Sequence, residues 1–193
     1  IMMIGSSFET EYNLSHYGYT FWPKEFTLDA YNLILKDGQI VQAYKVTVFI
    51  TIVGTILSML MTMMIAYPLS LGKLKGKTFF TFFIYFTMLF GGGLVPTYLL
   101  ISKYLDMRNT IWVLIIPVMF NVFLMRNFFK GIPGELAESA YVDGANDMQI
   151  LFKIILPVSV PGIATISLFY ALSYWNQWYN AMLYIDDSTL YPL

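Results

Sequence analysis

Four long stretches without a charged residue constrain this chain more than any other feature. They contain no Asp, Glu, Lys or Arg and cover residues 46–72, 78–102, 109–125 and 154–185. A bilayer core about 30 Å thick is crossed by roughly 20 mostly apolar residues in a helix. Strands of a membrane barrel would instead alternate in hydrophobicity over about ten residues. The pattern therefore predicts an all-α, polytopic membrane protein with four complete membrane helices, at about 44–68, 78–101, 108–129 and 158–184.

The composition agrees with membrane lipid as the surrounding medium. Hydrophobic residues make up 58% of the chain and charged residues 12%, against about 45–50% and about 25% in soluble domains. Intrinsic disorder is excluded because it requires low hydrophobicity and high net charge. The net charge of −1 excludes the broad basic surface of a nucleic-acid binding protein, so no nucleic acid is expected as a partner.

The sequence offers no set of residues suited to catalysis or to metal binding. It has no cysteine and a single histidine, His16, which excludes thiolate ligands and histidine clusters. Residues 72–78 end in Gly-Lys-Thr, as a phosphate-binding loop does, but Leu71 occupies the position of that loop's first glycine and apolar spans flank the segment. We expect no enzyme activity, no metal and no cofactor in this chain.

Lysine positions predict the orientation in the membrane. Lys73, Lys75 and Lys77 cluster in the connection after the first span, which places that connection in the cytoplasm by the positive-inside rule. Alternation of the spans then places residues 6–43 outside and residues 130–157 inside. The apolar residues at both ends are typical of interrupted helices. We expect residues 1–193 to form a single transmembrane domain of about six helices in the full chain, with the first and last helices missing or cut.

The cytoplasmic loop 130–157 has the signals of two short helices. Glu135–Val142 reads as about two helical turns that end at Asp143-Gly144, because glycine permits the positive φ of a helix stop. Asn146 is a suitable N-cap for a second helix, which Pro157 should end. Such a helix pair either presses into a groove of a partner protein or packs on its own subunit over the helix ends.

The residue pattern of this loop resembles the EAA loop of ABC-importer permeases. Glu138-Ser139-Ala140, then Gly144, then Ile154-x-Leu156-Pro157 follow that loop's spacing of Glu-Ala-Ala, three residues, Gly, nine residues and Ile-x-Leu-Pro. Asp143-Gly144-Ala145 is similar to a common variant within it. Ser139 departs from the usual alanine, although it remains small. The resemblance assigns coupling to the ATPase subunit to Glu138, Ser139, Ala140, Tyr141, Asp143, Gly144, Ala145, Ile154, Leu156 and Pro157.

Other segments resemble the carbohydrate branch of these binding-protein-dependent, MetI-like permeases. Phe90–Tyr98 and Arg126–Phe129 are similar to oligosaccharide permeases of the LplC and YtcP type. Phe21–Thr27 with Tyr31 looks like the external segment of carbohydrate permeases, and Trp175–Trp178 like the Trp-Asn segment after the EAA loop. The resemblance covers nearly the whole chain.

The resemblance implies a function and a set of partners. It implies a multi-pass subunit in the bacterial cell membrane (plasma or inner membrane) that forms half of a sugar import pathway. A second permease, two cytoplasmic ATPase subunits that bind the ATP, and an extracellular or periplasmic solute-binding protein would be its partners. The alternative is a non-transporting scaffold or sensor that binds a cytoplasmic protein through the same loop. A secondary carrier is disfavoured, because the four uncharged runs contain no ionisable Asp, Glu, Lys or Arg.

A polar and aromatic stretch near the end of the last span is the candidate substrate pathway. Amides pair with hydroxyl groups and aromatic rings offer apolar faces, a combination suited to sugars. Asn176 and Asn180 are four residues apart, which places them on one face of a continuous helix. An aromatic belt at the outer membrane interface explains the same residues equally well. The candidate residues are Tyr174, Trp175, Asn176, Trp178, Tyr179 and Asn180.

Overall fold

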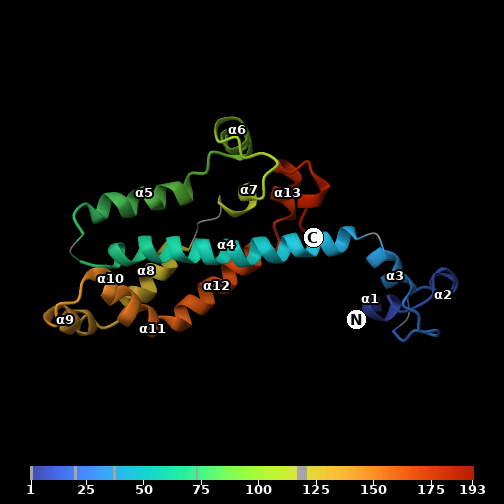
Figure 1. The fold of residues 1–193 in the computed structure, drawn as a ribbon, viewed down its shortest axis with the longest axis horizontal. Helices are drawn as coiled ribbons and strands as arrows, with labels where there is room; N and C mark the ends of the chain where they lie inside the picture. Colours follow the sequence, from blue (N-terminus) through green and yellow to red (C-terminus); the bar gives the residue numbers. More distant parts are fainter. Residues whose placement is uncertain (1, 20, 37, 73, 117–120) are drawn as a thin grey trace.

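A single long helix organises the molecule. The computed structural model describes residues 2–19, 21–36, 38–72, 74–116 and 121–193, and every regular element in them is helical. Figure 1 shows α4 (Gln39–Ser70) running through the centre, with α1 to α3 at one end and α9 and α10 at the other. The bundle is therefore built along one axis, and its two ends carry different polar segments.

The remaining helices follow the chain in short pieces. The first group comprises α1 (Met2–Ser6), α2 (Glu11–Tyr17), α3 (Asp29–Lys36), α5 (Lys77–Leu89), α6 (Leu94–Leu99) and the π-helical turn η1 (Leu100–Tyr104). The middle group comprises α7 (Trp112–Ile115), α8 (Val122–Lys130), α9 (Glu135–Val142), α10 (Asp147–Ile150) and the π-helical turn η2 (Leu151–Ile155). The last group comprises α11 (Leu156–Val158), α12 (Val160–Trp175), α13 (Trp178–Tyr184) and the 3-10 turn η3 (Ser188–Leu190).

Helix α4 confirms the first predicted span. It contains 32 residues, which corresponds to a length of about 48 Å at 1.5 Å per residue. By length and composition it is the one uninterrupted helix among the described residues that can cross a membrane. Two pairs of helices also meet these criteria when each bent pair is taken as one span, which gives up to three spans in the described residues.

The second predicted span, 78–101, is wrong as a continuous helix. Helix α5 ends at Leu89, and a new helix begins at Leu94 after a bend of 108°. Gly93 has a φ of +84°, a conformation that few residues other than glycine adopt. The three glycines at 91–93 therefore form a break, and Pro96 falls in the first turn of the new helix, where its missing N–H costs little.

The third and fourth predicted spans are also interrupted. Residues 108–111 are not helical, and the described helices of the third span are α7 and α8; residues 117–120 lie outside the described part of the chain. The fourth span pauses at Asn176 and Gln177, between α12 and α13. Hydrophobicity predicts which residues enter the membrane, but it does not detect breaks whose backbone groups are satisfied by tertiary contacts.

Helices α4 and α12 pack closely through hydroxyl groups and a glycine. The Tyr174 hydroxyl lies 2.7 Å from the Ser58 hydroxyl, and the Tyr170 hydroxyl lies 2.6 Å from that of Thr62. Tyr174 also donates a hydrogen bond of 2.8 Å to the carbonyl oxygen of Ile115, the last residue of α7. Within lipid there is little hydrophobic drive between helices, so hydrogen bonds and close contact hold them together.

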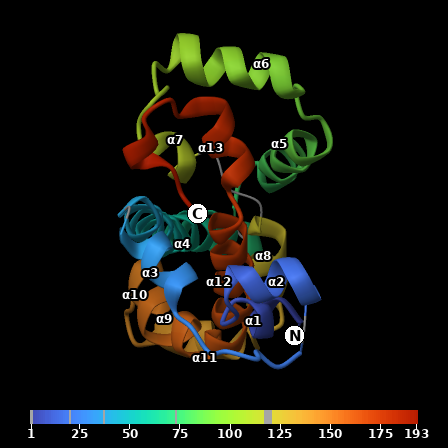
Figure 2. The same ribbon diagram turned by 90° about the vertical axis from the view of Figure 1, so that its right-hand side faces the viewer.

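Two glycines permit this close packing. A Cβ atom on Gly54 of α4 would lie 2.6 Å from the Tyr174 ring, and one on Gly162 of α12 would lie 2.6 Å from the Phe128 ring of α8. Figure 2 shows α12 and the helices α9 to α11 on one side of α4, with α5 and α6 on the other. Small residues at these two positions therefore set the distances between the three central helices.

The segment that precedes α4 is held together by a buried carboxylate, Glu9. Its oxygens accept hydrogen bonds from the Asn13 side chain at 2.9 Å, from the Lys24 backbone N–H at 2.6 Å and from the Glu25 backbone N–H at 3.2 Å. Burial acts to raise the pKa of this carboxyl group, but these hydrogen bonds, together with one from the Thr10 backbone, outweigh burial and lower the pKa below 4.5. Glu9 therefore joins α2 to the loop that follows it.

Gly54→Ala tests the α4–α12 contact. The added methyl group would overlap the Tyr174 ring, and overpacking of this kind costs about 1–3 kcal/mol. We expect a lower midpoint of thermal unfolding for the detergent-solubilised protein. Gly72→Ala is the matched control, since a Cβ atom there meets nothing within 4 Å. Equal midpoints for the two variants would contradict the close contact.

Glu9→Gln tests whether the Glu9 carboxylate holds the loop after α2 in place. Because the folded-state pKa of Glu9 is lowered, its stabilising effect is complete above the ordinary value of 4.5 and is lost as the pH falls through the folded-state pKa. We expect protease cleavage near residues 18–28 to increase in acid for the wild type, and to be fast at neutral pH in Glu9→Gln. The control Glu11→Gln, on an exposed neighbour, should behave as wild type at neutral pH.

Candidate functional site

The loop between α8 and α12 folds as two short helices joined by a tight turn. Helix α9 has the bounds predicted from the sequence, Glu135–Val142. The turn follows at Gly144, whose φ is +80°. Asn146 then caps α10 in a reciprocal capping box: its side chain accepts from the Gln149 N–H, and the Gln149 side chain accepts from the Asn146 N–H. The predicted stop and the predicted N-cap are both confirmed.

Pro157 does not end the second helix, contrary to the sequence prediction. The helical path continues from α10 through η2 to Val158, and the chain bends by 83° only before α12, at Ser159. In the π-helical turn η2 the Leu156 N–H bonds to the carbonyl of Leu151, five residues earlier. This wider turn accommodates Pro157, because the usual hydrogen bonds between residues four apart are already shifted to residues five apart just before the proline ring.

Helix α9 has one face packed on its own subunit and one face exposed. Ala140 is only 8% exposed and belongs to the same core as Tyr67 and Phe129. Val142, two residues further along and on the other face of the helix, is 88% exposed. Ala140 therefore packs the helix against its own subunit, where only a small side chain fits, and its role in coupling to the ATPase stays a prediction.

The exposed face of α9 carries two of the predicted coupling residues, Glu138 and Ser139, together with others outside that set. Leu136 and Val142 are exposed apolar side chains, and Glu135, Glu138 and Ser139 are exposed polar ones. Val142 was missed because it lies outside the conserved letters of the EAA pattern. Its signal in the sequence was its spacing of three and four residues from Ser139 and Glu138, which places all three on one helical face.

Tyr141 ties the two short helices together. Its hydroxyl donates a hydrogen bond to the Asp147 carboxylate at the start of α10. This hydrogen bond, together with burial, raises the pKa of Tyr141 to about 12, so the hydroxyl remains a donor throughout the physiological pH range. Tyr141 was expected to face the ATPase; it is half-buried and instead braces α9 against α10.

The other pattern residues divide between packing and exposure. Ala145, Ile154 and Leu156 pack against the core beneath the loop, and the Ala145 N–H bonds to the Ala140 carbonyl at 2.9 Å. Ser139, Asp143, Gly144 and Pro157 are exposed. The loop is therefore a rigid projection whose apolar positions anchor it to α4 and α8.

A groove lies between α9 and the end of α4. Its volume is 350 Å³. Lys130 and Glu138 give it two opposite charges, and Tyr67 and Tyr141 give it aromatic walls. A second hollow of 420 Å³ opens on the other side of Tyr67 and Tyr141, along Met148 and Leu151. A partner side chain inserted here would contact both the loop and a membrane helix.

The predicted pathway residues do not share one surface. Tyr174 is 0% exposed, and its hydroxyl is occupied between α4 and Ile115, so its role is helix packing. Asn176 is exposed, and its side-chain amide donates to the Leu172 carbonyl at 2.8 Å. Because the helix is interrupted at residues 176–177, the prediction that Asn176 and Asn180 share a continuous helical face is wrong.

The remaining pathway residues are accessible to different degrees. Trp178 is 62% exposed, Trp175 and Tyr179 are partly exposed, and Asn180 is half-buried. Trp175 stands edge-on to Tyr44 of α4, with ring centroids 5.7 Å apart. These side chains surround the break between α12 and α13 and offer aromatic faces and amides there.

Gln177 is the polar residue that sequence reasoning did not place in the pathway set. It is 5% exposed, and both atoms of its amide lack a hydrogen-bond partner among the described residues. A buried amide without a partner is costly in an apolar environment. Its position within the polar stretch was visible in the sequence, but its burial at a helix break was not.

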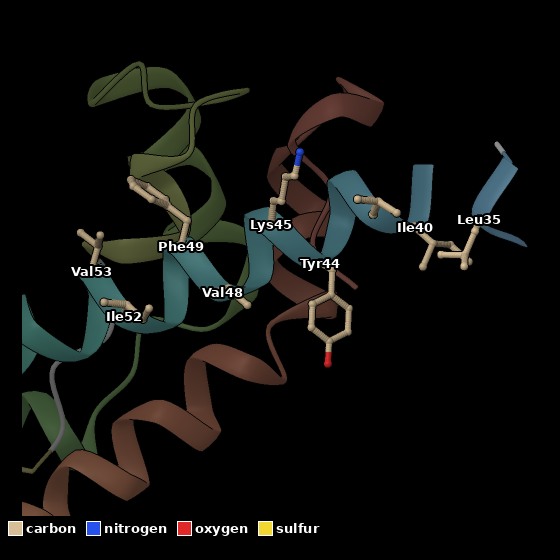
Figure 3. A pocket seen from close by; sticks show the side chains of 9 residues that line it. Leu35, Ile40, Tyr44, Lys45, Val48, Phe49, Ile52 and Val53 are labelled. Atoms are coloured by element: carbon tan, nitrogen blue, oxygen red, sulfur yellow. The ribbon is translucent and has the colours of Figure 1, made fainter. Parts of the chain in front are cut away.

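An open, mainly apolar hollow lies along the N-terminal half of α4. It has a volume of 620 Å³. Figure 3 shows the Lys45 ammonium group and the Tyr44 hydroxyl pointing to opposite sides of the helix, so neither polar group turns the hollow into a sugar site. A face of this chemistry suits contact with lipid or with another membrane helix. It is lined by Leu35, Ile40, Val41, Tyr44, Lys45, Val48, Phe49, Ile52 and Val53.

The long apolar helix, the bent helix pairs and the projecting helix–turn–helix loop together define a membrane permease domain. Residues 43–179 match the family of binding-protein-dependent transport system inner membrane components, and the chain belongs to this family. The resemblance read from the EAA loop and the all-α membrane fold are thereby confirmed. The family is one of transporter permeases, and it implies a membrane location for this chain and, in general, a partner permease, an ATPase and a solute-binding protein.

Individual relatives are similar along the whole chain. The polygalacturonan/rhamnogalacturonan transport system permease protein YtcP of Bacillus subtilis is 43% identical, and protein LplC of the same organism is 41% identical; each comparison covers 100% of this chain and 68% or 66% of the relative. A bacterial ABC transporter involved in the import of the acidic polysaccharide alginate has a solved structure with a TM-score of 0.95 and 32% identity, covering 100% of this chain and 70% of that one.

The chain spans about two thirds of the length of these relatives. The matched part contains the coupling-loop pattern, the break at residues 90–93 and the polar stretch after Tyr174. The similarity therefore covers each segment from which the sequence resemblance was drawn.

Proposed function

We propose that this chain is a permease subunit of an ATP-driven importer for oligosaccharides in the bacterial cell membrane. The observation that carries the proposal is the α9–α10 projection, whose residue pattern follows the EAA loop and whose exposed face has no covering element in the described chain. Relatives named for polygalacturonan/rhamnogalacturonan and for arabinooligosaccharides support a carbohydrate substrate. A second permease would complete the pathway, two ATPase subunits would supply the energy, and an external binding protein would deliver the sugar.

The proposed coupling role follows from the packing of α9 against the core of its own subunit. Its inner face is fixed to the core through Ala140 and Tyr141, and its outer face offers Glu138 and Val142. A force applied to the outer face by an ATPase subunit is passed to α4 and α8 through packed side chains, since close-packed interiors move as units. The bend at Ser159 lies between the loop and α12, and provides a point where that movement changes direction.

The pathway role is assigned to residues around the break between α12 and α13. Asn176 and Gln177 supply amides, and Trp175, Trp178 and Tyr179 supply aromatic faces, which together suit sugar hydroxyls and ring faces. Polar groups at membrane depth normally face a bundle interior or an aqueous cavity. The unpaired amide of Gln177 is available to a sugar in a conformation that opens the break.

Gly144→Val should uncouple transport from ATP hydrolysis. Gly144 has a positive φ and open space around it, so the substitution acts through backbone strain of about 1–3 kcal/mol and not through a clash. We expect a tenfold or greater loss of ATPase activity stimulated by the binding protein, with the two permeases still co-purifying. Gly144→Asn is the matched control, since asparagine tolerates this conformation, and should retain most of the stimulation.

Val142→Asp and Glu138→Ala test the same surface without backbone strain. Both side chains are exposed, so neither substitution should lower the unfolding temperature. We expect weaker binding of the ATPase subunits, measured by co-purification, and Val142→Ile should bind normally. Full stimulation in Gly144→Val, Val142→Asp and Glu138→Ala together would contradict the coupling role.

Asn176→Leu should reduce uptake of a radiolabelled oligosaccharide into proteoliposomes while the complex still assembles. The leucine side chain removes the amide donors and acceptors that a sugar would use, and Asn176→Gln keeps them and should retain uptake. Gln177→Leu separates a pathway role from a folding role, since replacing an unpaired buried amide with an apolar side chain should not destabilise the protein. Unchanged uptake in both leucine variants would remove this break from the pathway.

A further inference from the structure

Two cations are held beside the last turn of α4. The Lys77 ammonium group donates to the carbonyl oxygens of Leu71 at 2.6 Å and Ser70 at 3.4 Å. The Arg126 Nε–H donates to the Leu69 carbonyl at 3.0 Å. Carbonyls at a helix C-terminus carry partial negative charge and favour cations. These bonds fix the positions of both cations but satisfy only part of the guanidinium group, which has five N–H donors.

Among the described residues, no carboxylate lines the cavity at Lys77 and Arg126 or forms an ion pair with either; Glu138 shares only the α9 groove with Lys130. The ion pair found among the described residues joins Arg108 and Asp186, which lie on loops at the opposite end of the bundle from α9. Lys130 lies within electrostatic range of Lys77 and adds a third positive charge. A cluster of this kind at a membrane boundary attracts an anion.

A cavity opens directly beside the two cations. It has a volume of 330 Å³ and lies between the start of α5 and Arg126 of α8. The hydroxyl group of Thr81 is buried at this site and has no hydrogen-bond partner among the described residues. Beyond the hydroxyl groups the wall becomes aromatic, so the cavity is polar at one end and apolar along the membrane helix. Its lining residues are Lys77, Thr78, Thr81, Phe82, Tyr85 and Arg126.

We propose that this cavity binds an anionic phospholipid, with its phosphate between Lys77 and Arg126 and its acyl chain along Phe82 and Tyr85. The phosphate oxygens would accept hydrogen bonds from the Arg126 guanidinium group and the Thr81 hydroxyl, which both retain unused donors. The uncompensated positive charge selects an anionic headgroup over a zwitterionic one. The site lies at the end of α4 that carries the coupling loop, which corresponds to the cytoplasmic leaflet under the proposed orientation.

The aromatic wall favours a lipid over an acidic segment of a protein partner. Phe79, Phe82, Phe83 and Phe86 are all largely exposed along α5, and they extend from the basic end into the apolar part of the helix. An acidic loop of a soluble subunit would satisfy the cations but would leave these rings without apolar contacts. A phospholipid satisfies both ends of the cavity with one molecule.

The experiment measures lipid binding to the full-length permease in its assembled complex. Spin-labelled phosphatidylglycerol and phosphatidylcholine are compared in nanodiscs, and the motionally restricted fraction reports bound lipid. We expect a fivefold or greater preference for phosphatidylglycerol in the wild type. The preference should fall to near one in Lys77→Gln/Arg126→Gln, and should be unchanged in Lys153→Gln, which removes an exposed charge outside the cavity.

Further variants keep the result interpretable if the double variant fails to assemble. Lys130→Gln removes a charge that caps no carbonyl among the described contacts, and should halve the preference or more. Thr81→Val removes the unpaired hydroxyl group and leaves every charge in place, and should also weaken the preference. An unchanged preference in Lys130→Gln and Thr81→Val, or protection of the site by the ATPase subunits in place of lipid, would overturn the proposal. Sugar uptake is measured in parallel, so a failure of this inference is distinct from a failure of the proposed transport function.

Discussion

The contact between α4 and α12 is the interaction on which the other parts of the structure depend. Two tyrosine hydroxyls of α12 bond to hydroxyls of α4, and Gly54 lets the Tyr174 ring approach the helix backbone. In lipid, apolar side chains gain little by leaving the surroundings for a helix interface, so polar contacts and small residues decide which helices pair. Tyr174 extends this contact to Ile115, and so brings α7 into the same assembly.

This central pair connects two ends with different chemistry. One end carries the α9–α10 projection, anchored through Ala140 and Tyr141, and the other carries the N-terminal segment organised around Glu9. The helix breaks lie at residues 90–93 and at the two ends of α12, at Ser159 and at residues 176–177. Because the bends lie at the ends of helices, a movement of the loop can change the packing of α12 while the α4–α12 contact holds the bundle together.

The local signals of the coupling loop were readable because they act over a few residues. A helix stop at Gly144 follows from its positive φ, and a capping box at Asn146 needs only a residue three positions later. The burial of Ala140 and Tyr141 was not readable from the sequence, because a short helix has two faces and only the tertiary core decides which one is covered. Pro157 was misjudged because the helical path continues past it through a π-helical turn, which the sequence does not announce. The coupling role of the exposed face and the lipid site remain predictions.

The uncharged runs and the loop pattern were enough to identify an all-α membrane permease. Both signals are local: a charge is costly in lipid wherever it stands, and a motif is defined by the spacing of nearby residues. Lys73, on which the orientation partly rests, lies outside the described residues. The number of uninterrupted spans, the break at Gln177 and the burial of Tyr174 were decided by the tertiary structure. The burial of Tyr174 depends on partners distant in the chain, Ser58 and Ile115, as the position of Arg126 depends on Leu69. Contacts of this kind produce no repeating pattern in the sequence. Neither partner residue is unusual by itself, and only the fold brings the two together.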